Sequence, residues 1–425
     1  MKKWIKIILL LVSVICLSGC KSTAIRWQEQ YDLGAKYLSE GNYQEAILTF
    51  TAAIEIDPKQ IPAYVGRGNA YVRFSETEEA RHLTFDEMGD LTYTDEEIAE
   101  MEAAKVAENL DAAQADYEKA IELDETSIDA YLGWADVYIR LGDYDKALEI
   151  LQQGLEKTDS DRLVEKIKEF EDGTITDSSG EIRAVINDNA ADGQPKYLEA
   201  IHVRPDENLR SVFTDLSFYD KSNVAIILDG ADYEIDDYVL DLKNVTIQGT
   251  QGTRLVSYSG YDTVVNFQRC KGLTLKNLVI GHELPSTKKS CQAGVLWITE
   301  SEVSLVNCDI FGCGKYGISV SDSTLVAQDS VIRDCSSWIM SLVDSNVTFH
   351  KCAFSGNGYE APADEAVFVN AYDREDDVLV IKFSDCTFTN NKNQNLYSLP
   401  SHNQYNLGRI QIEFNNCSFF GNAWE

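Results

Sequence analysis

The sequence VSLVNCDI at residues 303–310 is repeated in outline as LVAQDSVI at residues 325–332 and as VTFHKCAF at residues 347–354. Each copy begins 22 residues after the previous one, and small or apolar residues fill the first, third, sixth and eighth positions of all three. Alternate residues of a strand share a face, so the first and third positions point to the same side. A fixed period of this length predicts a stack of equivalent units.

The pattern extends in both directions from these three copies. Positions equivalent to Val303 occur from Leu273 to Ile412, with 8, 12 and 9 extra residues inserted as loops between the outer copies. The repeat resembles the right-handed parallel β-helix of pectin-lyase-like proteins over about residues 197–425. Residues 207–216 resemble the helix that caps the first turn in that family. The alternative, an antiparallel β-sandwich, gives no reason for the same inward positions to recur.

A second repeat occupies the N-terminal part of the chain. Residues 27–60 match the 34-residue tetratricopeptide pattern, residues 131–154 repeat it, and a middle copy is split between residues 64–71 and 113–121. Small residues are needed where two helices cross closely, and aromatic residues fill the groove between helix pairs. Three copies and a capping helix at residues 161–171 suffice for a stable stack. The matching residues of the first copy are Leu33, Gly34, Tyr37, Gly41, Tyr43, Ala46, Phe50, Ala53 and Pro58.

An acidic insertion separates the two halves of the middle copy, roughly at residues 76–108. It contains twelve acidic residues against Arg81 and Lys105, and residues 96–106 are expected to be helical. Two interpretations stay open at this point. The insertion is either a solvated helical extension or an interaction arm for a basic partner.

These patterns divide the chain into four parts. Residues 1–19 read as a lipoprotein signal peptide and residues 20–171 as the tetratricopeptide repeat domain. Residues 172–195, rich in Gly, Asp, Asn and Ser, read as a linker, and residues 196–425 as the β-helix. The predicted fold class is therefore multidomain, an all-α tetratricopeptide solenoid followed by an all-β right-handed parallel β-helix.

The N-terminus, MKKWIKIILLLVSVICLSGC at residues 1–20, has the character of an export signal. Lysines precede an apolar segment at residues 7–16. The sequence LSGC at residues 17–20 resembles the lipobox of bacterial lipoproteins, in which cleavage precedes an acylated cysteine. The resemblance implies that Cys20 is lipidated and holds the protein on the lipid bilayer of the cell membrane, on the extracellular or cell-envelope side. The alternative is an ordinary secretory signal with a chance cysteine.

The charge of the chain narrows the class of partner. There are 70 acidic residues against 37 Lys and Arg, a formal net charge of −33 at pH 7. Binding to nucleic acid needs clustered cations to neutralise phosphates, so nucleic acid is excluded as a partner. The apolar N-terminal segment is too short for a spanning helix, which excludes a polytopic membrane protein.

Apart from Cys16 in the signal peptide and the expected anchor Cys20, eight of the ten cysteines lie in exported domains, where disulfides usually form. The register of the repeat argues otherwise, because Cys308, Cys352, Cys386 and Cys417 fall in one inward column. In-register parallel neighbours hold Cβ atoms about 4.8 Å apart, beyond the roughly 3.5–4.5 Å of a disulfide. We therefore expect stacked, buried free thiols, with disulfides and metal binding as the alternatives.

Of the catalytic motifs of hydrolases in the β-helix family, Asp-Asp occurs here in a loop at residues 376–377, and others are missing or broken. Hydrolases of that family carry His-Gly and Arg-x-Lys motifs, whereas here His-Gly is missing and residues 409–411 read Arg-Ile-Gln. The nearest constellation is Asp309 with Arg333, one rung apart, and His350 on the next rung. We take these three as candidate catalytic residues, and ordinary outward polar residues as the alternative.

An acidic loop at residues 360–377 offers oxygen ligands for a hard cation. Asp373, Asp376 and Asp377 are the candidate calcium ligands, and a solvated charged loop is the alternative. Apart from calcium, no cofactor is expected. The aromatic residues that would either stack on sugar rings or be buried in the β-helix are Tyr316, Trp338, Phe311 and Tyr359.

The function expected from these features is that of a membrane-anchored extracellular binding or scaffold protein. The helical repeats would engage a protein partner, and the β-helix would engage cell-surface or environmental polysaccharide, an assignment by family analogy. The alternatives are a carbohydrate-active enzyme, either a polysaccharide lyase or a glycoside hydrolase, and a purely structural spacer. The sequence favours binding over catalysis, since acid–base cleavage needs two groups within reach of one bond and no such pair recurs across the rungs.

Overall fold

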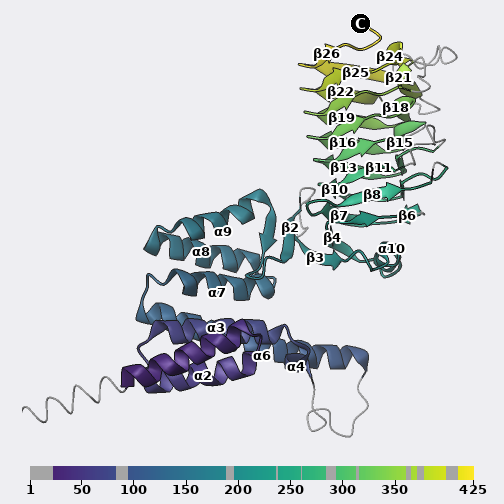
Figure 1. The fold of residues 1–425 in the computed structure, drawn as a ribbon. Helices are drawn as coiled ribbons and strands as arrows, with labels where there is room; N and C mark the ends of the chain where they lie inside the picture. The colour runs from purple at the N-terminus through teal and green to yellow at the C-terminus, as the bar shows by residue number, and fades with distance from the viewer. Residues whose placement is uncertain are drawn as a thin grey trace, which may run out of the picture. The chain divides into compact units, whose positions relative to one another are not determined.

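The computed structural model describes residues 23–82, 94–187, 196–235, 238–259, 261–283, 293–312, 315–359, 365–370, 378–398 and 410–425. The chain divides into two compact units, Met1–Arg183 and Ala184–Glu425. The first is helical, and the second is built from three long sheets (Figure 1). Among the described residues, no helix combines the length and the apolar character needed to cross a membrane.

The helical unit is a stack of antiparallel helix pairs. Residues 23–39 form its first described helix, and each later helix packs against the next one along the chain. The other helices are α2 (Tyr43–Ile56), α3 (Ile61–Ser75), α4 (Glu78–Arg81), α6 (Asp95–Leu123), α7 (Ile128–Arg140), α8 (Tyr144–Thr158) and α9 (Asp161–Asp172). The tetratricopeptide pattern and its capping helix are thus confirmed.

Close helix crossing explains the small residues of the repeat. A Cβ atom at Gly34 would lie 2.9 Å from the ring of Phe50, and one at Gly68 would lie 2.9 Å from the ring of Tyr117. Both rings are buried in the contacts between helices. The glycines therefore leave the space that the aromatic rings fill, so that neighbouring helix pairs can approach.

The acidic insertion extends a repeat helix. The expected helix at residues 96–106 and the second helix of the split repeat form one continuous helix, α6, which has 29 residues. Thr94 and Glu97 close its N-terminus as a reciprocal capping box. Ala113, Tyr117 and Ala120 in its second half are buried against the neighbouring repeats.

One long sheet carries the inward positions quoted above. Within the described residues this first sheet has the order β1-β2-β3-β4-β7-β10-β13-β16-β19-β22-β25. Its strands are β1 (Thr174–Thr176), β2 (Ile182–Ile186), β3 (Tyr197–Val203), β4 (Ser222–Leu228), β7 (Lys243–Gly249), β10 (Leu273–Lys276), β13 (Glu302–Val306), β16 (Thr324–Gln328), β19 (Asn346–His350), β22 (Leu379–Ser384) and β25 (Ile410–Asn415).

Two further sheets complete each rung. The second sheet contains β5 (Asp232–Tyr233), β8 (Arg254–Ser257), β11 (Val279–His282), β14 (Asp309–Phe311), β17 (Val331–Arg333), β20 (Ala353–Ser355), β23 (Thr387–Thr389) and β26 (Ser418–Phe420). The third sheet contains β6 (Tyr238–Leu240), β9 (Val265–Gln268), β12 (Leu296–Thr299), β15 (Tyr316–Ser321), β18 (Trp338–Val343), β21 (Glu365–Asn370) and β24 (Asn395–Ser398). Figure 1 shows the rungs lying one on another.

The strand register confirms the columns read from the sequence. Leu273 pairs with Val303, Val303 with Leu325, and Leu325 with Val347, all in parallel strands. Such pairing excludes the antiparallel sandwich. Identical side chains consequently stack through the core, as where the Phe383 ring lies parallel to its neighbours above and below, with centroids 5.2 and 4.9 Å away.

Single left-handed residues turn the chain from the first sheet to the second. Asn277, Asn307 and Asp329 occupy this position on successive rungs with φ of 55, 51 and 49°. Asn and Asp tolerate this conformation better than most residues. Farther round the rung, three buried side-chain amides donate hydrogen bonds to neighbouring rungs. Asn357 donates to Asn391, Asn391 donates to Asn422, and Asn422 donates to the carbonyl of Phe388.

The N-terminal end of the β-helix is formed by a helix and by strands. The helix expected at residues 207–216 is present as α10 (Leu209–Phe218), and Leu209, Phe213 and Leu216 are buried in the same core as the rungs. The stretch interpreted as a linker, 172–195, includes β1 and β2 in its described part. β2 pairs antiparallel with β3, whereas β3 pairs parallel with β4.

Candidate functional site

The outer face of the third sheet carries aromatic side chains on consecutive rungs. Tyr238 is in register with Asn266, and Asn266 with Trp297. One column across, Tyr316 is in register with Trp338. Trp297 lies between the buried Leu296 and Ile298, and Tyr238 precedes the buried Val239, so both of these rings point outward.

The rings of Tyr238, Trp297 and Tyr316 border a groove of about 370 Å³. Trp297 is 37% exposed, Tyr238 is 58% exposed, and Tyr261, from the loop before β9, is 73% exposed. Gly294 leaves the groove open beside Trp297, because a Cβ atom there would lie 3.3 Å from the indole Nε1. Its polar lining includes Asp262, Asn266 and Lys315.

Tyr316, which lines the groove, belongs to a stacked aromatic pair. The rings of Tyr316 and Trp338 lie 5.1 Å apart at an interplanar angle of 23°. Lys315 places its ammonium 5.1 Å from the Tyr316 ring centroid, and Trp338 donates to Glu365 at 3.3 Å. Both rings are half-buried. Each ring therefore packs partly against the β-helix and keeps part of its surface exposed. Of the other two aromatic candidates, Phe311 lies on the second sheet and Tyr359 is exposed.

The structure brings together two of the three catalytic candidates. Arg333 donates from Nε to Asp309 Oδ1 at 2.9 Å and from Nη2 to Oδ2 at 2.8 Å, on the outer face of the second sheet. The same guanidinium donates to Asp334 and covers the ring of Phe311. The hydrogen bond to Asp309 raises the pKa of Arg333 further above its ordinary value. Arg333 is therefore a charged, fully engaged cation and is poorly suited to removing a proton.

The third candidate, His350, lies elsewhere. It ends β19 of the first sheet, and its Nδ1 lies 3.6 Å from Asp385 Oδ2. The turn at Lys351 separates it from the second sheet. Neighbouring rungs in sequence therefore do not place His350 on the same face as Asp309 and Arg333.

The remaining site predictions fall largely outside the described residues. Cys20 and the calcium candidates Asp373, Asp376 and Asp377 all lie there. Within the parts of the chain that the structure does describe, no cluster of three or more His, Cys, Asp or Glu side chains is arranged to hold a metal ion. Lipidation and calcium binding stay predictions.

The described cysteines are free thiols, as the register argument predicts. Those of the inward column are Cys308, Cys352 and Cys386, all buried, and the half-buried Cys417. Burial raises the pKa of Cys308 to about 11. A buried, protonated thiol packs as a small apolar group and is a poor nucleophile.

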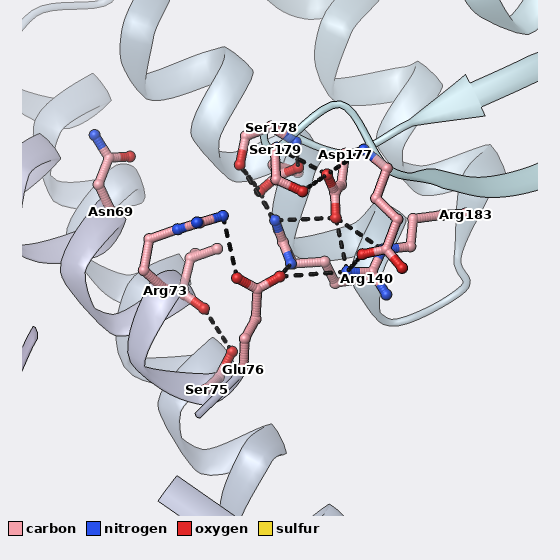
Figure 2. Close-up of polar contacts among 12 residues, drawn as sticks. Asn69, Arg73, Ser75, Glu76, Arg140, Asp177, Ser178, Ser179 and Arg183 are labelled. Atoms are coloured by element: carbon pink, nitrogen blue, oxygen red, sulfur yellow. Dashed lines mark hydrogen bonds and ion pairs between the residues drawn. The ribbon is translucent and has the colours of Figure 1, made fainter. Parts of the chain in front are cut away.

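A buried ionic network in the helical unit was missed by the sequence reasoning. Arg140 on α7 is in contact with Glu76 and also binds Asp136 at 2.9 Å and Asp177 at 3.2 Å. Arg183 binds the same Asp177 carboxylate at 2.7 Å. Figure 2 shows these groups converging between the end of α3 and the turn that follows β1.

The network holds the Asp177 turn in place. The Asp177 side chain has no exposed surface, and burial alone would raise its pKa. The hydrogen bond from Ser179 and the charges of Arg140 and Arg183 outweigh burial and lower the pKa of Asp177 to about 2. A sequence signal existed, because Arg73 and Arg140 follow Tyr64 and Tyr131 by nine residues each. This nine-residue spacing within the repeats did not predict that Asp177 would join the network.

Comparison with known families agrees with both repeats. A family described as "Right handed beta helix region" matches residues 199–423. Families described as "TPR repeat" and "Tetratricopeptide repeat" match residues 34–73 and 107–169. Among curated proteins, no relative matches this chain.

Two solved structures are similar to parts of this chain at low identity. A thermophilic tetratricopeptide repeat protein from Thermus thermophilus is 18% identical with a TM-score of 0.27, over 35% of this chain and 66% of that one. The pectin methylesterase from Aspergillus niger is 12% identical with a TM-score of 0.33, over 56% of this chain and 88% of that one. This chain thus spans slightly less than two thirds of the first structure. With more than half of its residues in the family match, the chain belongs to the right-handed β-helix region family.

Proposed function

We propose that this protein binds polysaccharide at the outer face of the third sheet and does not cleave it. The groove bordered by Tyr238, Tyr261 and Trp297 is the observation that carries the proposal. Aromatic rings that keep a face exposed offer flat apolar surfaces to the C–H faces of sugar rings, while polar neighbours orient the hydroxyls. Rungs repeat at about 4.8 Å, which is close to the length of one sugar unit. One polysaccharide can therefore contact several rungs.

The arrangement of charged groups supports binding over cleavage. Cleavage by acid and base needs two groups whose pKa values are pushed apart beside one bond. Arg333 and Asp309 neutralise each other on a different sheet from the groove, and His350 lies on yet another. In the described part of the groove, Asp262 and Lys315 are the charged lining residues.

The helical unit and the N-terminus complete the proposal. Tetratricopeptide repeats generally mediate protein–protein contacts, so this unit would hold a protein partner. The LSGC sequence would direct lipidation of Cys20, and the attached acyl chains would hold the protein at the outer surface of the cell membrane. Replacing Cys20 with Ala should move the protein out of the detergent phase, and unchanged partitioning would contradict the anchor.

Binding is tested on the purified full chain with a panel of hexasaccharides. Isothermal titration calorimetry reports occupancy without depending on any one side chain, and chromatography of the same mixtures, with and without calcium, reports cleavage. Binding that is lost in Trp297→Ala and leaves the sugars intact is expected. New reducing or unsaturated ends that disappear in Arg333→Ala would show an enzyme instead.

A further inference from the structure

The outward positions of the third sheet are almost free of charge. Register defines one column as Tyr238, Asn266, Trp297, Ser319, Ser341 and Phe368. The parallel columns on either side, begun by Leu240 and by Tyr316, contain Glu365 as their one charged residue among the described strands. Charged residues make up 25% of the chain, so this face departs strongly from the average.

The other two outer faces carry paired charges on the same rungs. On the second sheet, Arg254 binds Asp232 at 2.7 Å, and Arg333 binds Asp309. At the edge of the first sheet, Lys271, just before β10, binds Glu302 of β13 at 3.1 Å. The lack of charge is therefore a property of the groove-bearing face and not of the β-helix as a whole.

We infer that the groove takes an uncharged glycan and rejects acidic polysaccharides. The inference rests on the proposed function and specifies its substrate class. A polyanion would approach a protein of net charge −33 and find Lys315 as the cation in the described groove lining, already placed over the Tyr316 ring. Repulsion of like charge and loss of hydration would then oppose binding without a compensating ion pair.

The side chains that are present suit sugar hydroxyls. Asn266 offers an amide beside Trp297 in the groove lining, and the half-buried Ser319 continues the column with a hydroxyl group. Amides and hydroxyls can both donate and accept, as sugar hydroxyls do. Neutral recognition of this kind depends little on ionic strength, whereas recognition of a charged chain is screened by salt.

The test compares cellohexaose, xylohexaose and mannohexaose with hexagalacturonate and with a chitosan hexamer. At least one neutral hexasaccharide should bind with an affinity unchanged from about 0.01 M to about 1 M salt, while the Debye length falls from about 30 to about 3 Å. Hexagalacturonate should bind at least about tenfold more weakly, and any chitosan binding should vanish at high salt. Preferred binding of hexagalacturonate would overturn the inference while leaving glycan binding intact.

Variants assign the binding to the groove. Trp297→Ala and, independently, Tyr261→Ala should each weaken the neutral ligand by at least about tenfold, as loss of a central aromatic contact does. Phe420→Ala is the matched control, because Phe420 is 74% exposed but lies on β26 of the second sheet. No binding by any sugar would overturn the proposed function itself. An equal loss in Phe420→Ala would place the binding away from the third sheet.

Discussion

The two units of this protein are stabilised in different ways. Inside the β-helix, each rung repeats the contacts of the last, as in the stacked rings of Phe349, Phe383 and Phe414. In the helical unit, a buried network joins Glu76, Arg140 and Asp177, which no period relates. Repeated apolar contacts depend on the volume that each side chain fills, whereas a buried charge depends on particular partners. The helical unit should therefore respond to acid and the β-helix to loss of volume.

The largest expected effect comes from opening a cavity in the β-helix. Phe383→Ala removes a ring that is 1% exposed and stacked on both sides, and should cost roughly 3–5 kcal/mol of unfolding free energy. The matched control is Thr387→Ala on the exposed side of β23, expected within about 0.5 kcal/mol of the native chain. Denaturant titration measures both, and equal losses would mean that inward and outward positions are misassigned.

Removing the central cation of the network should be almost as damaging in the helical unit. Arg140→Met keeps the apolar stem but leaves Asp136 and Asp177 buried without that charge, which should cost about 3 kcal/mol or more. The loss should appear in the helical circular dichroism signal during urea unfolding. An unchanged midpoint would show that the carboxylates find other partners.

Acid should weaken the helical unit through Asp177. Its folded pKa of about 2 lies below the unfolded value of 3.8, so the carboxylate stabilises the fold above that value and the benefit is lost as the pH falls through about 2. The shift corresponds to about 2.5 kcal/mol. Subtracting the stability curve of Asp177→Asn from that of the native chain isolates the contribution, and a difference that does not change between pH 5 and pH 2 would contradict it.

The smallest effect is expected from the ion pair on the second sheet. The Arg333 side chain is 37% exposed, so its pair with Asp309 should contribute no more than about 1 kcal/mol. Glycan affinity should be unchanged in Arg333→Ala, because the third sheet carries the groove. A large loss of stability would show that a charged surface pair supports the rungs as much as the core does.

The periodic parts of this protein could be read from the sequence. The period of 22 residues identified the column through Val303, and the register of the strands confirmed it. The tetratricopeptide spacing likewise located helices that contain Gly34 and Gly68. Both predictions were correct for one reason. A repeat makes the same contact many times, so every copy needs a residue of the same size and polarity at that position.

Only the tertiary structure decided which side chains meet across different elements. Asp309, Arg333 and His350 looked equivalent along the rungs, yet one turn sends His350 to another sheet. Trp297 became a groove residue because Tyr261 and Lys315 come from loops of other rungs. Asp177 reached Arg140 across 37 positions of sequence with no period to announce it. Contacts made once depend on the path of the backbone between elements, and a periodic pattern carries no information about that path.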